Sequence, residues 1–277
     1  MLLVMKIALI QQRASEDLEV NRRRGLAAMD EAAAGGAQAV CFAELAFDPF
    51  WPQVPATPER LKMAEPIPGP TTERFQAKAA ALGVVCILNI FERDGSLTYD
   101  TSPVIDADGT LLGVTRMVHI TDFACFHERG YYAPSDRGAP LYDTAVGRIG
   151  VAICYDRHYP EYMRALALGG ADVVFVPQAG AVNEWPEGLY EAEMRVAAFQ
   201  NGIFTALCNR VGPEPELTFA GESFVCDGDG KVIARAANEA DEILFADLDM
   251  PSLENSCARR LLIPDRRPEL YAKWLCR

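Results

Sequence analysis

The stretch that decides the fold runs Ile149-Gly150-Val151-Ala152-Ile153-Cys154-Tyr155-Asp156-Arg157-His158-Tyr159-Pro160-Glu161. Five apolar residues precede Cys154, which predicts a buried strand that ends at the thiol. Pro160 and Glu161 are typical of the first turn of a helix. The sequence therefore predicts a sharp strand-to-helix turn at Cys154. Such a turn presents the side chain at its apex together with the backbone N–H groups that follow it.

Apolar runs of the same kind recur on both sides of this turn and predict buried strands at 6–10, 39–43, 84–88, 149–153, 172–176 and 203–207. Apolar residues at helical spacing, each run ended by glycine, predict helices at 18–34, 71–82, 159–168 and 190–200. Asp-Gly turns predict hairpins within 104–113 and 223–233. Strand and helix alternate in both halves of the chain, which indicates an α/β fold.

Composition limits the class of protein. The chain has 277 residues, of which 50% are hydrophobic and 23% charged, so it can bury a large core. The formal net charge of −13 repels phosphate groups, and we expect neither nucleic acid nor an anionic membrane as a partner. No linker of low complexity divides the chain. We therefore expect one domain over 1–277, with its core at about 5–249.

The N-terminus and the cysteines bear on the compartment. Residues 1–6 lack the order of charged, apolar and small residues found in a signal peptide, and no apolar run approaches the ~20 residues of a membrane span. Eight cysteines are scattered without Cys-x-x-Cys spacing, which argues against a structural zinc site or a disulfide framework. We expect a cytoplasmic protein. The proline-rich tail, 250–277, is expected to lie outside the sheets and at a subunit interface.

Three side chains are candidates for chemistry. Cys154 is either a buried structural thiol or a nucleophile whose pKa is lowered at the start of a helix. Glu44 directly follows an apolar run, so its carboxyl group must be hydrogen-bonded, paired or protonated. A general base and a structural ion pair both meet that need. Glu128 has the same two interpretations, with Arg129 as an adjacent partner.

The three histidines leave a further alternative open. His119, His127 and His158 are each ordinary polar residues or candidate bases, and His158 lies four residues after Cys154. A Cys-His thiol enzyme is therefore a rival interpretation. The chain has no glycine-rich phosphate loop and no His-Glu-x-x-His motif, so nucleotide and metal chemistry find no support.

Several blocks of sequence, taken in order, resemble the nitrilase superfamily of carbon–nitrogen hydrolases. They are Phe42-Ala43-Glu44-Leu45, Arg116-Met117-Val118-His119-Ile120, Phe126-His127-Glu128 and Gly150-Val151-Ala152-Ile153-Cys154-Tyr155-Asp156. Later blocks, including Asn209-Arg210-Val211-Gly212 and Gly221-Glu222-Ser223, extend the similarity to about Asp249.

The resemblance implies a four-layer αββα sandwich with a Glu-Lys-Cys catalytic site. Carried over by position, Cys154 is the nucleophile and Glu44 the base that takes its proton. Glu128 is a second carboxylate near the substrate, and backbone N–H groups at Tyr155 hold the oxyanion. The resemblance implies no cofactor and no metal.

One position departs from the family pattern, which reads Arg-Lys-x-His. This chain has Arg116-Met117-Val118-His119, so Met117 stands at the lysine position. Loss of a donor that stabilises a developing oxyanion typically costs ~3 kcal/mol, or ~100-fold in rate. Three outcomes are open: a slower hydrolase, a hydrolase in which Arg116 or His119 supplies the positive charge, or a catalytically impaired or non-catalytic relative.

Within the superfamily, residues 154–160 are most similar to the ureidopropionase and N-carbamoylputrescine amidohydrolase branches. This implies hydrolysis of an amide or N-carbamoyl amine through a thioester on Cys154, with release of ammonia. Arg157 and His158 are expected to bind substrate, with Glu184 and Trp185 at the mouth of the site. Acidic residues there favour a neutral or cationic substrate. Family members usually pair, which implies a homodimer or larger homo-oligomer.

Overall fold

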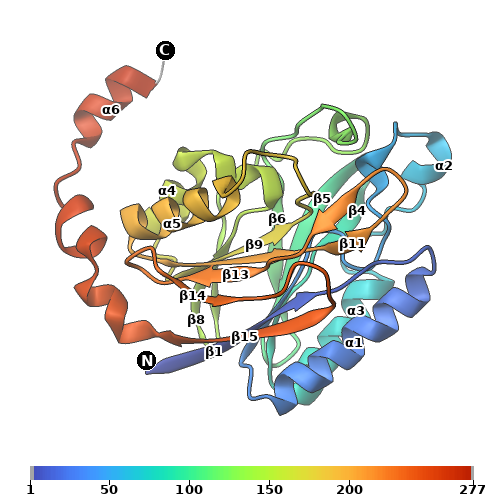
Figure 1. Ribbon diagram of the computed structural model, residues 1–277, viewed down its shortest axis with the longest axis horizontal. Helices are drawn as coiled ribbons and strands as arrows, with labels where there is room; N and C mark the ends of the chain where they lie inside the picture. Colours follow the sequence, from blue (N-terminus) through green and yellow to red (C-terminus); the bar gives the residue numbers. More distant parts are fainter. Residues whose placement is uncertain (1–2, 276–277) are drawn as a thin grey trace.

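The computed structural model describes residues 3–275. Within that range the strands form two large sheets and one short hairpin (Figure 1). The first sheet has the order β15-β1-β2-β3-β5-β4, with β6 paired to β5. Its strands are β1 (Val4–Gln11), β2 (Ala39–Phe42), β3 (Val85–Ile87), β4 (Ile90–Asp94), β5 (Leu97–Ile105), β6 (Leu111–Arg116) and β15 (Glu242–Asp249).

The second sheet has the order β14-β13-β10-β9-β8-β7. Its strands are β7 (Leu141–Thr144), β8 (Gly147–Val151), β9 (Val173–Gln178), β10 (Phe204–Asn209), β13 (Phe224–Cys226) and β14 (Val232–Arg235). The separate hairpin joins β11 (Val211–Pro213) to β12 (Thr218–Ala220). The central strands β8, β9 and β10 run parallel, as do β1, β2 and β3, which the strand-helix alternation requires.

Helices cover the outer face of each sheet (Figure 1). Helices α1 (Leu18–Ala34) and α3 (Pro70–Leu82) pack on the first sheet, and α4 (Pro160–Leu168) and α5 (Leu189–Asn201) pack on the second. The inner faces of the two sheets pack on each other. Because side chains alternate along a strand, Ile7 of β1 points into this inner core and Ala8 points toward α1 and α3. The predicted αββα sandwich is confirmed.

Helix ends follow local sequence. The Asp17 side chain caps α1 by accepting hydrogen bonds from the backbone N–H groups of Glu19 and Val20. Gly83 ends α3 in the left-handed conformation with φ 68°, which only glycine adopts without cost. Helix α1 has its predicted bounds. Helix α3 ends where predicted and begins one residue before its predicted start.

Several strands differ from expectation, since β4, β7, β11, β12 and β15 were not predicted and β8 ends early. Strand β8 ends at Val151, two residues early, because Cys154–His158 form a 3-10 turn that leads into α4. Strand β15 was not expected, and it pairs antiparallel with the whole of β1. Its alternating exposed and buried residues give a weaker pattern than the continuous apolar runs of the central strands.

The tail lies outside the sheets from Met250 onward, as predicted. It forms a 3-10 turn (Met250–Asn255), a π-helical turn (Ala258–Leu262) and α6 (Pro268–Leu275). Arg259 ties its start to the body through Asp172, at 2.7 Å. Figure 1 shows α6 standing away from the sandwich. The short helix α2 (Pro58–Leu61) precedes α3. No helix within residues 3–275 has the length and apolar character needed to cross a membrane.

Candidate active site

Cys154 lies at the carboxyl end of β8, at the first position of the 3-10 turn that leads into α4. Its φ of 40° is in the left-handed region, which a side-chain-bearing residue adopts at a cost. The residue is 5% exposed. Backbone strain of this kind is common at functional sites, and here it holds the thiol at the apex of the predicted turn.

Glu44 lies just beyond β2, on the other sheet. Its side chain is fully buried, and neither carboxylate oxygen accepts a well-aligned hydrogen bond from the described residues. The next residue, Leu45, has φ 46° and donates its N–H to Asn89 Oδ1 at 2.8 Å. The buried Arg210 guanidinium donates to the carbonyls of Glu44 and Leu45. Backbone contacts therefore fix the carboxyl group while leaving its oxygens free.

Glu128 opens a short 3-10 turn and is 1% exposed. Its Oε2 accepts the backbone N–H of Thr121 at 3.2 Å, and its Oε1 has no partner among the described residues. Burial raises the pKa of Glu128 well above its usual value. Arg129, a possible partner in sequence, instead directs its Nε to the carbonyl of Ile120 at 3.5 Å.

The structure brings Glu44, Cys154 and Glu128 together. Burial and the nearby Glu128 carboxylate raise the pKa of Glu44 to about 7, a net value against which Asp100 and the Cys154 thiol act to lower it. Burial also raises the pKa of the Cys154 thiol well above its usual value. The charge of Glu44 adds to that rise, and Arg157 opposes it. A carboxyl group that titrates near neutrality beside a thiol can take its proton and return it.

Met117 is buried just after β6, in the same inner core as Cys154, and its backbone N–H donates to the Asp100 carbonyl at 3.0 Å. Arg116 binds Glu92 through Nε at 2.7 Å and also pairs with Asp94. The Nδ1 of His119 lies 2.7 Å from Asp156 Oδ1. Both residues are therefore engaged by other carboxylates, and the structure gives no support to either as a substitute for a lysine.

Arg157 is the basic side chain whose charge lowers the pKa of the Cys154 thiol. It is 4% exposed and donates to the carbonyl of Cys154 and to Gln178 Oε1, each at 2.8 Å. His158 Nδ1 lies 2.6 Å from Glu193 Oε1. Both hydrogen bonds of Arg157 come from Nη1, one of them to the Cys154 carbonyl, whereas its Nε and Nη2 have no hydrogen-bond partner among the described residues. Substrate binding by Arg157 and His158 stays a prediction.

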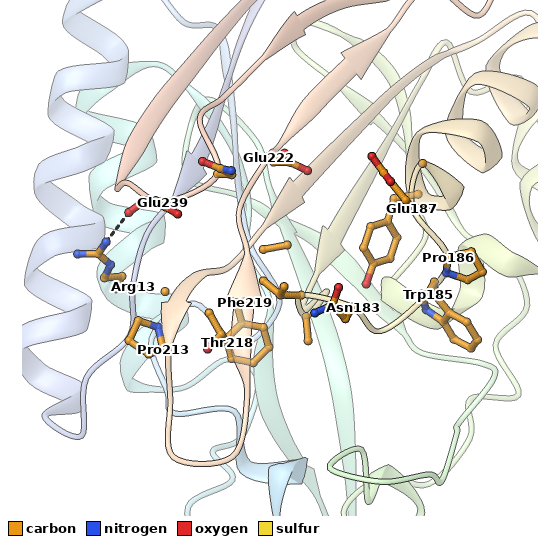
Figure 2. Close-up of a pocket in the computed structure, with 17 residues that line it drawn as sticks. Arg13, Asn183, Trp185, Pro186, Glu187, Pro213, Thr218, Phe219, Glu222 and Glu239 are labelled. Atoms are coloured by element: carbon orange, nitrogen blue, oxygen red, sulfur yellow. Dashed lines mark hydrogen bonds between the residues drawn. The ribbon is translucent and has the colours of Figure 1, made fainter.

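A cavity of about 610 Å³ lies between residues 181–190 and the hairpin of β11 and β12, and Glu44, Cys154 and Glu128 are not among its lining residues (Figure 2). Trp185, expected at the mouth of the site, lines this cavity together with Asn183 and Glu187; that the cavity is the mouth of the site stays a prediction. Glu184 does not line it, because its Oε2 turns inward to accept hydrogen bonds from Ala181 N and the Tyr190 hydroxyl. Tyr190 lines the cavity with one side and covers the Arg157 guanidinium at 4.7 Å.

The family model for carbon–nitrogen hydrolases matches residues 6–256. The chain belongs to the carbon–nitrogen hydrolase family. It is 32% identical to an N-carbamoylputrescine amidase from Arabidopsis thaliana over 96% of this chain and 93% of the relative. A carbon–nitrogen hydrolase from Helicobacter pylori G27 superposes with a TM-score of 0.92 at 28% identity, over 98% of both chains.

A third relative shows the chemistry of the family. A variant of an amidase from Nesterenkonia sp. AN1 holds the acetamide moiety of fluoroacetamide covalently at its active-site cysteine. It superposes on this chain with a TM-score of 0.81 at 25% identity, over 98% of this chain and 96% of that one. This carbon–nitrogen hydrolase is accordingly thiol-dependent and acts on bonds other than peptide bonds, as the sequence predicted. The alternative of an impaired or non-catalytic relative finds no support in these relatives.

Three buried polar residues near the site went unassigned in the sequence. Asn89 and Arg210 hold the backbone after Glu44, and Asp100 lies beside its carboxyl group. Arg210 fell within a block that resembles the family but carried no assigned role. The available signal was weak: Asn89 and Arg210 only follow the predicted strands 84–88 and 203–207, and Asp100 lies outside every predicted strand.

Proposed function

We propose that Cys154 is the nucleophile, Glu44 the general base and Glu128 a substrate-positioning carboxylate in the hydrolysis of an N-carbamoyl amine or a short amide. One observation carries this proposal. The strained turn holds the Cys154 thiol within hydrogen-bonding reach of a buried carboxyl group whose pKa is about 7. Near neutral pH, Glu44 is then divided between the form that accepts a proton and the form that donates one.

In the acylation step, the Cys154 S–H bond breaks and its proton passes to Glu44 as Sγ bonds to the carbonyl carbon. The backbone N–H of Tyr155 lies in the first turn after the nucleophile, where amides lack partners within the turn, and it is suited to hold the oxyanion. The carbon–nitrogen bond then breaks. Glu44 gives its proton to the leaving nitrogen, and ammonia departs.

Hydrolysis of the thioester reverses these roles. Glu44, ionised again, removes a proton from a water molecule as the water oxygen bonds to the thioester carbon. The carbon–sulfur bond then breaks, and the proton on Glu44 returns to the thiolate. Every proton is accounted for by Glu44, Cys154 and water.

The cavity supports a substrate whose remote end is neutral or cationic. Glu187, Glu222 and Glu239 contribute acidic groups to its lining, and Arg13 is the one basic side chain there, engaged by the Glu239 carbonyl (Figure 2). An amine on the substrate would be attracted to this cavity, and a carboxylate would be repelled. The relative from Arabidopsis thaliana, named for an N-carbamoyl polyamine, supports the same class.

Ammonia release tests this proposal. We expect turnover of N-carbamoyl alkylamines with a distal amino group, slower turnover of short neutral amides, and the least with N-carbamoyl amino acids. Fluoroacetamide should add one acetamide unit to the intact protein, seen by mass spectrometry, and Cys154→Ala should abolish both the adduct and turnover. Full turnover by Cys154→Ala would refute the assignment.

We also propose that residues 1–277 form one domain that assembles as a homodimer or larger homo-oligomer, with α6 at the interface. In α6, Trp274 and Leu275 are 55% and 68% exposed. Side chains this apolar are usually covered by a partner. The seven described cysteines are free thiols, which fits the reducing compartment of a cytoplasmic protein.

Deleting residues 268–277 should lower the oligomeric state while leaving the sandwich folded, because α6 stands away from it. Light scattering coupled to size-exclusion chromatography measures the mass, and circular dichroism measures the fold. A truncated chain of unchanged mass would place the interface elsewhere.

A further inference from the structure

A third buried carboxyl group, that of Asp100 in β5, lies near Glu44 without an assigned role. Its side chain is 1% exposed. Asp100 Oδ1 accepts a hydrogen bond from Asn89 Nδ2 at 2.6 Å, whereas its Oδ2 accepts none from the described residues. Asn89 also binds the backbone next to Glu44, whose two carboxylate oxygens likewise have no hydrogen-bond partner among the described residues. Two acids this close in a dry site hold a proton between them, because both cannot ionise without a cation.

Asn89 fixes the distance between the two acids. This fully buried amide accepts the Leu45 N–H, next to Glu44, at 2.8 Å. It also donates to Asp100 and, at 3.2 Å, to Ser102 Oγ. Because one side chain binds the segment after β2 and two residues of β5, the Asp100 and Glu44 carboxyl groups form a built pair.

The pair adjoins the position where the resemblance places an ammonium group. Met117 donates its backbone N–H to the Asp100 carbonyl, and its thioether has no proton to offer. The charged and titratable groups that act on Glu44 are Glu128, Asp100, Cys154 and Arg210, and those that act on Asp100 include Glu44 and Asp156. Arg210 already binds backbone carbonyls. The remaining hydrogen-bond donor for the Glu44 carboxylate is then a protonated carboxyl group of Asp100.

We propose that Asp100 is a positioning residue, held as the neutral acid, whose Oδ2–H donates to the Glu44 carboxylate where the family uses an ammonium group. The inference rests on the proposed role of Glu44 as base. In the acylation step the Cys154 proton moves to Glu44, and the proton of Asp100 stays on Asp100. Burial raises the pKa of Asp100 well above its usual value, and its hydrogen bond lowers the pKa of Glu44, both as this role requires.

Two substitutions of Asp100 distinguish the effect of its hydrogen-bond donor from the effect of its carboxyl group. Asp100→Asn keeps the shape and places an N–H donor toward Glu44, whereas Asp100→Ala removes the donor. The readout is the rate of Cys154 alkylation by iodoacetamide against pH, which requires no substrate. Without the donor, the pKa of Glu44 rises, so Asp100→Ala should move the rate profile upward by about one pH unit and slow alkylation about tenfold at pH 6. Asp100→Asn should stay within a few-fold of the natural chain.

Equal profiles for Asp100→Ala and the natural chain would overturn the proposal, as would an Asp100→Asn profile displaced as far as that of Asp100→Ala. Infrared spectroscopy gives a readout that does not depend on reactivity. The C=O stretch of a protonated carboxyl group should be present at pH 8 and lost in Asp100→Asn, with Glu128→Gln as the matched removal of another buried acid. No difference between the chain and Asp100→Asn would also overturn it. A Cys154 thiol indifferent to Glu44→Gln would instead refute the role of Glu44 itself.

Discussion

Glu44→Gln should lower turnover by about 10³-fold, within the range of about 10² to 10⁴ that general acid–base catalysis supplies. The amide has the shape of the carboxyl group but cannot accept the Cys154 proton or activate water. In the natural chain, turnover should rise with pH through about 7, because the base works in its ionised form and its pKa is about 7. In Glu44→Gln this limb should disappear. Initial rates of ammonia release from pH 5 to 9 measure both effects.

Glu161→Gln is the matched control for this substitution, since Glu161 is exposed at the start of α4, and it should leave the pH profile in place. A Cys-His mechanism makes the opposite prediction. In that case Glu44→Gln would keep its activity and His158→Ala would lose it. Retention of full turnover by Glu44→Gln would decide against the present assignment.

Met117→Lys should raise turnover by up to ~100-fold, the typical worth of one donor to a developing oxyanion. Met117 adjoins Asp100, and oxygens of Glu44, Asp100 and Glu128 have no hydrogen-bond partner among the described residues. An ammonium group would favour the ionised form of those acids and lower the pKa of Glu44, so the rising limb of the pH profile should also move to lower pH. The kcat and its pH dependence measure both effects.

Met117→Leu separates charge from shape, since it fills a similar volume without an ammonium group and should give none of this gain. If Asp100 occupies the donor position, the double variant Met117→Lys with Asp100→Asn should gain more than Met117→Lys alone, because an ionised Asp100 would compete with Glu44 for the new cation. A rate for Met117→Lys no higher than that of Met117→Leu would refute the missing-cation account.

Much of the fold could be predicted because the central strands are continuous apolar runs and the helices end in glycine or begin at caps. Helix α1 matches its prediction at both ends. Strand β15 could not be predicted in the same way. Its burial alternates, and its pairing partner β1 lies at the opposite end of the sequence, so the local pattern carries little of the information.

The candidate site was also predicted only in part from the sequence. Cys154, Glu44 and Glu128 were identified because each follows or lies in a block that resembles the family. Their assembly depends on two sheets packing face to face, which no local pattern encodes. Asp100 was missed because a single aspartate in a strand gives no sign of its partner, and the Glu44 carboxyl group that it meets lies 56 positions earlier in the chain.

The proposed base, Glu44, and the proposed nucleophile, Cys154, follow strands of different sheets, β2 and β8, and Arg210 reaches from the end of β10 to the carbonyls after β2. The proposed catalytic residues therefore lie together only while the inner faces of the two sheets are packed on each other. Catalysis should be more fragile than the backbone ladders on either side. A low concentration of denaturant that shifts the two sheets by about an ångström should abolish activity while the helices and strands remain folded. Loss of activity is therefore expected before loss of secondary structure.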